Sequence, residues 1–249
     1  MNLSDISDLI SDLQGRLDKA ADPQTKIWFE NYLKHSIQYR GVKTPEVTRI
    51  LGKWRNVHDL QQVSEADQLT LAAALIRQEY AEDKFAGTLY IQKYLLKKVE
   101  MDSLLAKAED LFSSGAFFDW STTDWFCVRV LGPAIVHHGL EAGKRVAGWC
   151  EKSNLWHRRA SIVPFRGVVR DEAYHQLIKS TIAILVKEQE RFIQTGVGWV
   201  ISDLSKVYPR EATALVECHF DRLSAEVIRR HTKYLPDHKT YKARKRNTK

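Results

Sequence analysis

The chain has 249 residues, with 38 Lys and Arg against 31 Asp and Glu, which gives a formal net charge of +7. Apolar residues make up 44% and charged residues 28%, the balance of an ordinary globular protein, so a chain that is disordered throughout is excluded. The longest stretches without a charged residue have eleven residues, 130–140 and 192–202, whereas a membrane-spanning helix needs about twenty.

The N-terminus, MNLSDISDLI, lacks the basic region and the apolar core of a secretory signal. The three cysteines, Cys127, Cys150 and Cys218, lie far apart, and the sequence has no CxxC motif. These features predict a reduced, cytoplasmic protein without a disulfide framework and without a cysteine-based zinc site.

Helical periodicity is the dominant pattern, because apolar residues recur at three- and four-residue spacing along nearly the whole chain. We expect about twelve helices of roughly 10–18 residues, joined by short turns and without a linker between domains. In chain order, Thr44 is the expected N-cap of a helix with Pro45 at its first position and Glu46 in its first turn, and Ser64 begins the next predicted helix. Gly115 and Gly139 end helices, Asn154 begins one, Gly167 ends one, and Pro209 and Pro236 mark breaks.

The predicted fold class is therefore all-α. Many similar short helices in succession are typical of stacked helical pairs, which curve and expose a long concave face. Such a face suits an extended partner such as a duplex. A right-angled globular bundle is the alternative, since no exact repeat period is visible.

The positive charge gathers in two regions. Residues 233–249 carry seven basic residues and one acidic residue, and residues 140–170 carry seven basic and two acidic residues. A nucleic-acid surface needs such clusters, because neutralising phosphates releases counterions. The C-terminal cluster can equally be a solvated, disordered end.

Asp124 interrupts an apolar helical face. In WSTTDWFCVRVLGPAIV, Trp120 and Asp124 lie four residues apart, and Val128 continues the same face. A carboxylate on an apolar face costs free energy unless it is paired or functional. The alternative is an acid in the first helical turn, which interacts favourably with the helix dipole.

Trp199 lies outside the apolar stripe of its helix. In FIQTGVGWVISDLSKV its side chain points about 130° away from the centre of the stripe. A tryptophan in that position either packs on a second layer of helices or faces a ligand. Gly196 and Gly198 each cost about 1 kcal/mol in a helix, and we expect them to let another backbone approach closely.

Arg158 and Arg159 flank the apolar stripe of the helix that Asn154 begins. A flanking arginine is either solvated or ion-paired within the protein, or it binds a phosphate or Asp124. Four of the other tryptophans are expected in the core: Trp28, Trp54, Trp125 and Trp149.

Three segments resemble the AlkD family of DNA alkylation repair glycosylases. WSTTD contains Trp120 and Asp124, NLWHRRASIV contains Arg159, and FIQTGVGWV contains Trp199. An N-terminal piece, YLKHSIQYRGVKTPEVTRIL, is similar to the family's helix–turn–helix before a Gly-x-x-Thr-Pro-Glu turn, and the similarity extends over about residues 25–232.

The resemblance implies an all-α superhelix of degenerate HEAT-like helical pairs with a concave basic face. One such domain would occupy residues 1–235, and residues 236–249 would form a basic, disordered tail. Ser121 and Thr123 stand where the family leads us to expect an acidic and an aliphatic residue.

Members of this family hydrolyse the N-glycosidic bond of cationic alkylpurines such as 3-methyladenine and 7-methylguanine. The resemblance implies that Asp124 stabilises the sugar cation and positions water, that Trp120 and Trp199 contact the deoxyribose and the lesion, and that Arg159 holds the phosphate backbone. It implies a monofunctional glycosylase of base excision repair that works without an enclosing base-flipping pocket.

The further DNA-binding candidates are Arg158, Tyr32 and Lys43. The expected partner is duplex DNA carrying alkylated purines, and we expect a cytoplasmic, nucleoid-associated monomer without membrane contact. The sequence contains no HExxH, GxxxxGK[ST], GxSxG or strand-linked GxGxxG motif, and we expect no cofactor and no metal.

Two other function classes remain open. A catalytically inactive HEAT-like protein would bind distorted or branched DNA with steep salt dependence and release no base. A protein-interaction scaffold built from helical pairs would have no affinity for duplex DNA.

Overall fold

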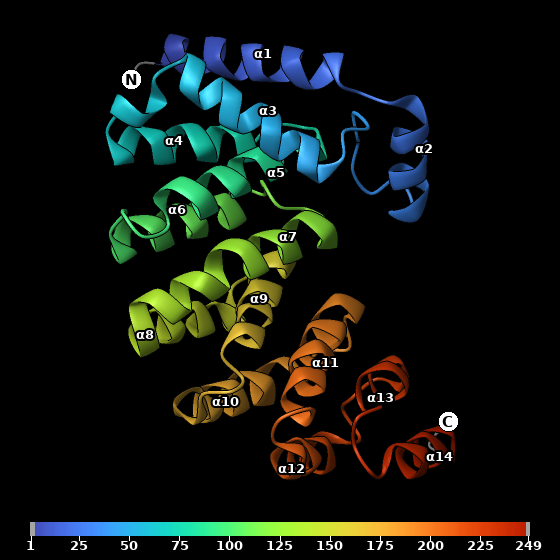
Figure 1. Ribbon diagram of the computed structural model, residues 1–249. Helices are drawn as coiled ribbons and strands as arrows, with labels where there is room; N and C mark the ends of the chain where they lie inside the picture. Colours follow the sequence, from blue (N-terminus) through green and yellow to red (C-terminus); the bar gives the residue numbers. More distant parts are fainter. Residues whose placement is uncertain (1–2, 248–249) are drawn as a thin grey trace. The chain divides into compact units, whose positions relative to one another are not determined.

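The computed structural model describes residues 3–247 and consists of a succession of helices (Figure 1). No β-strand occurs among these residues, so the predicted all-α class is confirmed. The chain divides into two compact units, Met1–Val130 and Leu131–Lys249. The division falls within a π-helical turn over Cys127–Leu131.

The first unit is organised around α5, which is buried along its whole length. Helices α3, α4 and α7 pack on α5, while α1 packs on α3 and α6 packs on α4. Gly87 permits the close approach of α4, because a Cβ atom there would lie 2.4 Å from the carbonyl oxygen of Ala72. The helices are α1 Leu3–Lys19, α2 Pro23–Tyr32, α3 Thr44–Val57, α4 Glu65–Ile76, α5 Ala81–Tyr90, α6 Met101–Ser113 and α7 Trp120–Phe126.

Buried charges at the start of α5 hold the loop between α2 and α3. The Glu82 carboxylate accepts hydrogen bonds from the backbone N–H groups of Arg40 at 2.9 Å, Gly41 at 2.8 Å and Val42 at 2.9 Å. The Arg40 guanidinium pairs with the buried Asp83 carboxylate at 2.8 Å. Gly41 has φ +99, and a Cβ atom there would lie 2.2 Å from the Asp22 carbonyl oxygen, so this turn requires glycine.

In the second unit, α11 is in contact with α9, α10, α12 and α13. The long segment α8 is interrupted at Gly139, which has φ 74 and ψ −158. A 3-10 turn over Val163–Gly167 packs on both α8 and α11. The helices are α8 Gly132–Ala147, α9 Leu155–Ala160, α10 His175–Leu185, α11 Arg191–Ser205, α12 Pro209–His219, α13 Ala225–His231 and α14 His238–Asn247.

Several predicted helix signals are found in the structure. The Ser64 hydroxyl caps α4, the Asn154 side chain caps α9, and Gly115 follows α6 with φ +73. Thr44 is not an N-cap, because α3 already begins at Thr44 and Lys43 occupies the cap position. Gly167 ends the 3-10 turn rather than an α-helix.

The C-terminal residues differ from the expected disordered tail, because residues 238–247 form α14 and pack on α13. The Tyr241 side chain is only 1% exposed. The Arg244 guanidinium donates to both carboxylate oxygens of Glu217 at 2.9 Å and lies 3.9 Å from the centre of the Phe220 ring. One buried ring and these contacts with the end of α12 order a segment whose composition alone indicates disorder.

Candidate functional site

Helix α7 carries two of the predicted residues and is started by a buried aspartate. Asp119 is 1% exposed and accepts hydrogen bonds from the backbone N–H groups of Ser121 at 2.8 Å and Thr122 at 3.1 Å. It also accepts from both hydroxyl groups, that of Ser121 at 2.6 Å and that of Thr122. Asp119 therefore accepts from backbone N–H groups that have no partner within the helix, as at the start of every α-helix.

The cap at Asp119 removes one interpretation of Asp124. Because α7 begins at Trp120, its first turn contains no acidic residue, which removes the alternative that Asp124 is a first-turn acid interacting with the helix dipole. Asp124 lies one turn after Trp120 and is 7% exposed. A carboxylate so far removed from water must be compensated by partners or retained for function.

Trp120 lies beside an aromatic pair on α2. The Trp28 and Tyr32 rings are stacked, with centroids 5.4 Å apart and an interplanar angle of 6°. The Tyr32 and Trp120 rings meet edge to face, with centroids 6.2 Å apart. Trp28 is 58% and Tyr32 61% exposed, so two aromatic rings are presented to solvent next to Trp120.

The exposure of Trp28 contradicts its predicted place in the core. Helix α2 has no buried residue and is held through Phe29, whose ring stacks on the buried Tyr39 at 4.8 Å. Burial raises the pKa of the Tyr39 phenol, whose hydroxyl group is hydrogen-bonded to Ser121. Trp54, 0% exposed, and Trp149, 4% exposed, are core residues as predicted, and Trp125 is half-buried.

Lys43 lies at the N-cap of α3, at the end of the loop that Glu82 holds. Its side chain is exposed and makes no ion pair with the residues that the structure describes. The first unit thus brings Tyr32 and Trp120 into contact and places Lys43 at the other end of the loop that follows α2.

Trp199 is half-buried on α11, and one face of its ring is covered by a cation. The Arg166 guanidinium lies 3.6 Å from the ring centroid, and its Nε donates to Asp203 at 2.6 Å. The tryptophan therefore packs on the turn over Val163–Gly167 with one face and keeps part of its surface accessible. A cation over an indole face is the interaction that a cationic lesion would also make.

The glycines beside Trp199 admit side chains rather than a backbone, which corrects the expectation for both. A Cβ atom at Gly196 would lie 3.3 Å from Nη1 of Arg159, and one at Gly198 would lie 2.6 Å from Cδ2 of His231. Burial and nearby arginines lower the pKa of His231 to about 4. His231 is therefore a neutral imidazole packed on α11.

Arg159 is buried, at 4% exposure, against the first turn of α11. Its Nη1 donates to the carbonyl oxygen of Phe192 and to the hydroxyl oxygen of Thr195, the latter at 3.2 Å. These contacts fix the guanidinium beside Gly196, which lies on the same helix as Trp199.

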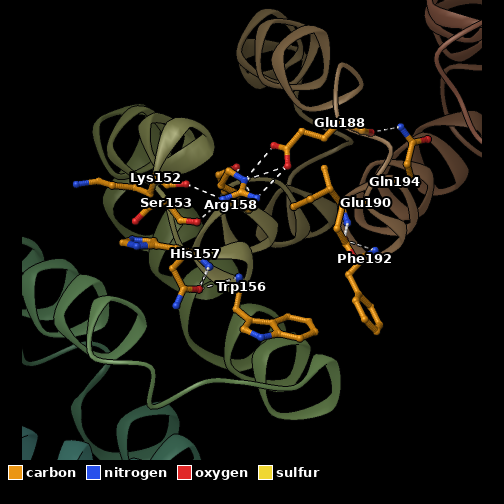
Figure 2. A network of polar contacts seen from close by, with 12 residues as sticks. Lys152, Ser153, Trp156, His157, Arg158, Glu188, Glu190, Phe192 and Gln194 are labelled. Carbon is orange, nitrogen blue, oxygen red and sulfur yellow. Dashed lines mark hydrogen bonds and ion pairs between the residues drawn. The ribbon is translucent and has the colours of Figure 1, made fainter. Parts of the chain in front are cut away.

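Arg158 is engaged within the second unit (Figure 2). Its Nε and Nη2 each donate to the Glu188 carboxylate at 2.9 Å, and Nη1 donates to the carbonyl oxygens of Lys152 at 2.9 Å and Ser153 at 2.6 Å. Such a bidentate pair fixes the guanidinium plane. The structure favours the ion-paired alternative for Arg158 over the predicted phosphate contact.

Three further residues contact or position the candidate site residues and were not predicted from the sequence to do so. Asp119 precedes Ser and Thr residues at the positions that an N-cap serves, so its signal was present in the sequence. Trp28 is four residues before Tyr32, the spacing of a helical side-chain pair. Arg166 contacts Trp199 from a short 3-10 turn, and no local pattern indicates this contact.

Comparison with known proteins decides the family. A sequence model of the DNA alkylation repair enzyme family matches residues 13–235. The chain belongs to the DNA alkylation repair enzyme family. The AlkD-like resemblance is thereby confirmed, and the family supports a role in the repair of alkylated DNA, with DNA as the partner.

A solved structure described as a predicted DNA alkylation repair enzyme from Enterococcus faecalis has the same fold. It is 18% identical in sequence, with a TM-score of 0.75, and the match covers 87% of this chain and 97% of the other. No curated protein matches the chain significantly. Among the described residues of this family member, no helix has the length and apolar character needed to span a bilayer.

Proposed function

We propose that this chain is a monofunctional DNA glycosylase of base excision repair that hydrolyses the N-glycosidic bond of cationic alkylpurines in duplex DNA. The observation that carries the proposal is the buried Asp124 carboxylate on α7, whose helix start is already capped by Asp119. A preorganised carboxylate beside the reacting sugar stabilises a developing sugar cation, and this is the role proposed for Asp124.

The chemistry needs little from the protein beyond electrostatics. Alkylation has already given the base a positive charge, so the bond from C1′ to nitrogen breaks with its electron pair moving to the base, which leaves neutral. Asp124 stabilises the oxocarbenium-like sugar, and water adds to C1′ and releases a proton. The products are the free alkylated base and an abasic site.

The aromatic residues and Arg159 act on binding. Trp120 and Trp199 present electron-rich ring faces to the deoxyribose and the cationic base, and the exposed Tyr32 extends the aromatic surface beside Trp120. Arg159, held by the Phe192 carbonyl oxygen, orients the phosphate backbone. Lys43 adds an exposed positive charge.

The test is release of free 7-methylguanine from methylated duplex DNA, followed by mass spectrometry. We expect the unmodified protein to release the base and Asp124→Asn to lower the single-turnover rate constant by about 10²–10³-fold, the loss typical of one preorganised electrostatic group. Asp110→Asn is the matched control, since this exposed carboxylate pairs with Arg77 at the surface. Absence of base release by the unmodified protein, or full release by Asp124→Asn, overturns the proposal.

One observation favours a catalytically inactive DNA-binding protein as the second candidate. The Arg166 guanidinium already lies over one face of the Trp199 ring, so a cationic lesion has to use the remaining surface. An inactive protein would bind distorted duplex without releasing base, and the same assay distinguishes the two.

A further inference from the structure

Helices α13 and α14 enclose a groove on the second unit, which we name the α13–α14 groove. Its volume is about 270 Å³. Helix α13 packs on both α11, which carries Trp199, and α14, and Figure 1 shows it between these two helices. The lining residues are Ala225, Glu226, Ile228, Arg229, Lys242, Lys245 and Arg246.

One face of α14 anchors the helix on α12. Tyr241 is buried, with its ring centroid 5.8 Å from that of Phe220, and Arg244 pairs with Glu217. The Lys245 ammonium donates to the carbonyl oxygens of Phe220 and Asp221 at 3.1 Å each, at the C-terminal end of α12. Helix α14 is therefore held in place by α12, and its remaining basic residues keep defined positions.

The groove itself holds positive charge that the protein does not neutralise. Lys242 and Arg246 lie four residues apart on one face of α14, opposite Arg229 on α13. None of the three makes an ion pair within residues 3–247. The one acid of the lining, Glu226, is already paired with Arg191 at 2.7 Å and Arg230 at 2.8 Å, which hold its pKa at about 2.

Such an arrangement is unfavourable without a partner, since like charges four residues apart on a helix destabilise it. A polyanion with regularly spaced charges removes this cost. Duplex DNA, the partner that the family implies, carries one negative charge per about 1.7 Å of its axis. The family match ends at residue 235, so α14 lies outside the matched region.

We propose that the α13–α14 groove binds backbone phosphates of duplex DNA through Arg229, Lys242 and Arg246. The groove adds sequence-independent affinity on the unit that carries Trp199 and Arg159 and takes no part in breaking the glycosidic bond. This proposal rests on the proposed function only through its partner, DNA.

The test measures the salt dependence of binding to undamaged duplex DNA by the full chain. Each phosphate contact contributes about 0.9 to the slope of log affinity against log salt. We expect the combined variant Arg229→Ala, Lys242→Ala and Arg246→Ala to reduce that slope by about 2–3. The matched control removes the same charge from exposed lysines of the first unit, Lys93→Ala, Lys97→Ala and Lys98→Ala, and is expected to change the slope by less than about 1.

A second variant tests the anchor. Tyr241→Ala removes the ring that holds α14 but retains all basic residues. We expect it to reduce the slope of log affinity against log salt, as the triple variant does. An unchanged slope in the triple variant, or an equal reduction in the lysine control, overturns the proposal. If the triple variant loses binding to vesicles of phosphatidylcholine and phosphatidylserine while its duplex binding is unchanged, the groove binds a membrane surface instead and the proposal is overturned.

Base release separates this proposal from the proposed function. We expect the triple variant to release 7-methylguanine at the unmodified rate when the protein is saturating. If the unmodified protein releases no base but the triple variant still loses salt dependence, the glycosylase proposal fails and the groove stands. If base is released and the slope does not change, only the groove fails.

Discussion

Asp119→Ala tests whether the cap of α7 positions Asp124 and Trp120. The Asp119 carboxylate accepts four hydrogen bonds, two from backbone N–H groups and two from hydroxyl groups. Loss of an N-cap side chain costs about 1 kcal/mol. The Thr122 hydroxyl, on a residue 1% exposed, loses its acceptor, which adds about 1–3 kcal/mol. We therefore expect the free energy of unfolding to fall by about 2–4 kcal/mol.

The effect on base release follows from the closeness of the cap to both site residues. Trp120 is the first residue of α7 and Asp124 lies one turn later, so fraying of the first turn displaces both side chains. A displacement of about 1 Å costs roughly 100-fold in rate, so we expect the single-turnover rate constant to fall by about 10–100-fold, with DNA affinity nearly unchanged. Asp119→Asn keeps one acceptor oxygen and is expected to restore part of the rate.

Urea denaturation and single-turnover release of 7-methylguanine measure the two quantities. The matched control is Ser64→Ala, which removes the N-cap of α4, where the Ser64 hydroxyl oxygen accepts from the Asp67 N–H at 3.2 Å. It should cost about 1 kcal/mol and leave base release unchanged. If Asp119→Ala lowers stability as expected but releases base at the normal rate, the positioning role of Asp119 is refuted.

Three further predictions concern packing and pH. Gly198→Ala should lower the unfolding free energy by about 1–3 kcal/mol in denaturant titrations, despite the better helix propensity of alanine, because its Cβ would lie 2.6 Å from the His231 ring. The free energy of unfolding should fall by about 2 kcal/mol between pH 6.5 and 4, because His231 is protonated in the unfolded chain over this range but not in the folded one, where its pKa is about 4. His231→Gln should remove this part of the pH dependence, and a pH profile of stability unaltered by the substitution contradicts the assignment to His231. Gly41→Ala should destabilise by more than about 2 kcal/mol, because φ is +99 and the Asp22 carbonyl oxygen occupies the space; a melting temperature equal to that of the unmodified protein contradicts this.

Local signals in the sequence predicted local structure well. The caps at Ser64 and Asn154 and the positive φ at Gly115 and Gly139 follow from side-chain and backbone preferences within a few residues. The all-α class follows from the same short-range periodicity. These features depend on interactions inside one helix, so a single sequence contains the information that they need.

Features that depend on distant partners were not predicted. Arg158 is engaged by Glu188, 30 residues away in the chain, and nothing near Arg158 indicates that pairing. Tryptophan is a residue type that is usually buried, but α2 contains no buried residue and the Trp28 ring is exposed. Helix α14 contains one buried ring, Tyr241. The helix is ordered by contacts with α12, which the composition of α14 alone does not indicate.

Helix α2 is secured from outside itself, by the Tyr39 ring beneath Phe29 and by the Glu82 carboxylate that fixes the following loop. Because none of its own residues is buried, substitutions along its outer surface should change stability by no more than about 0.5 kcal/mol. Mutation can therefore alter the rings that flank Trp120 almost independently of folding. In this family member the outer surface of α2 is therefore a segment that selection can vary without endangering the scaffold.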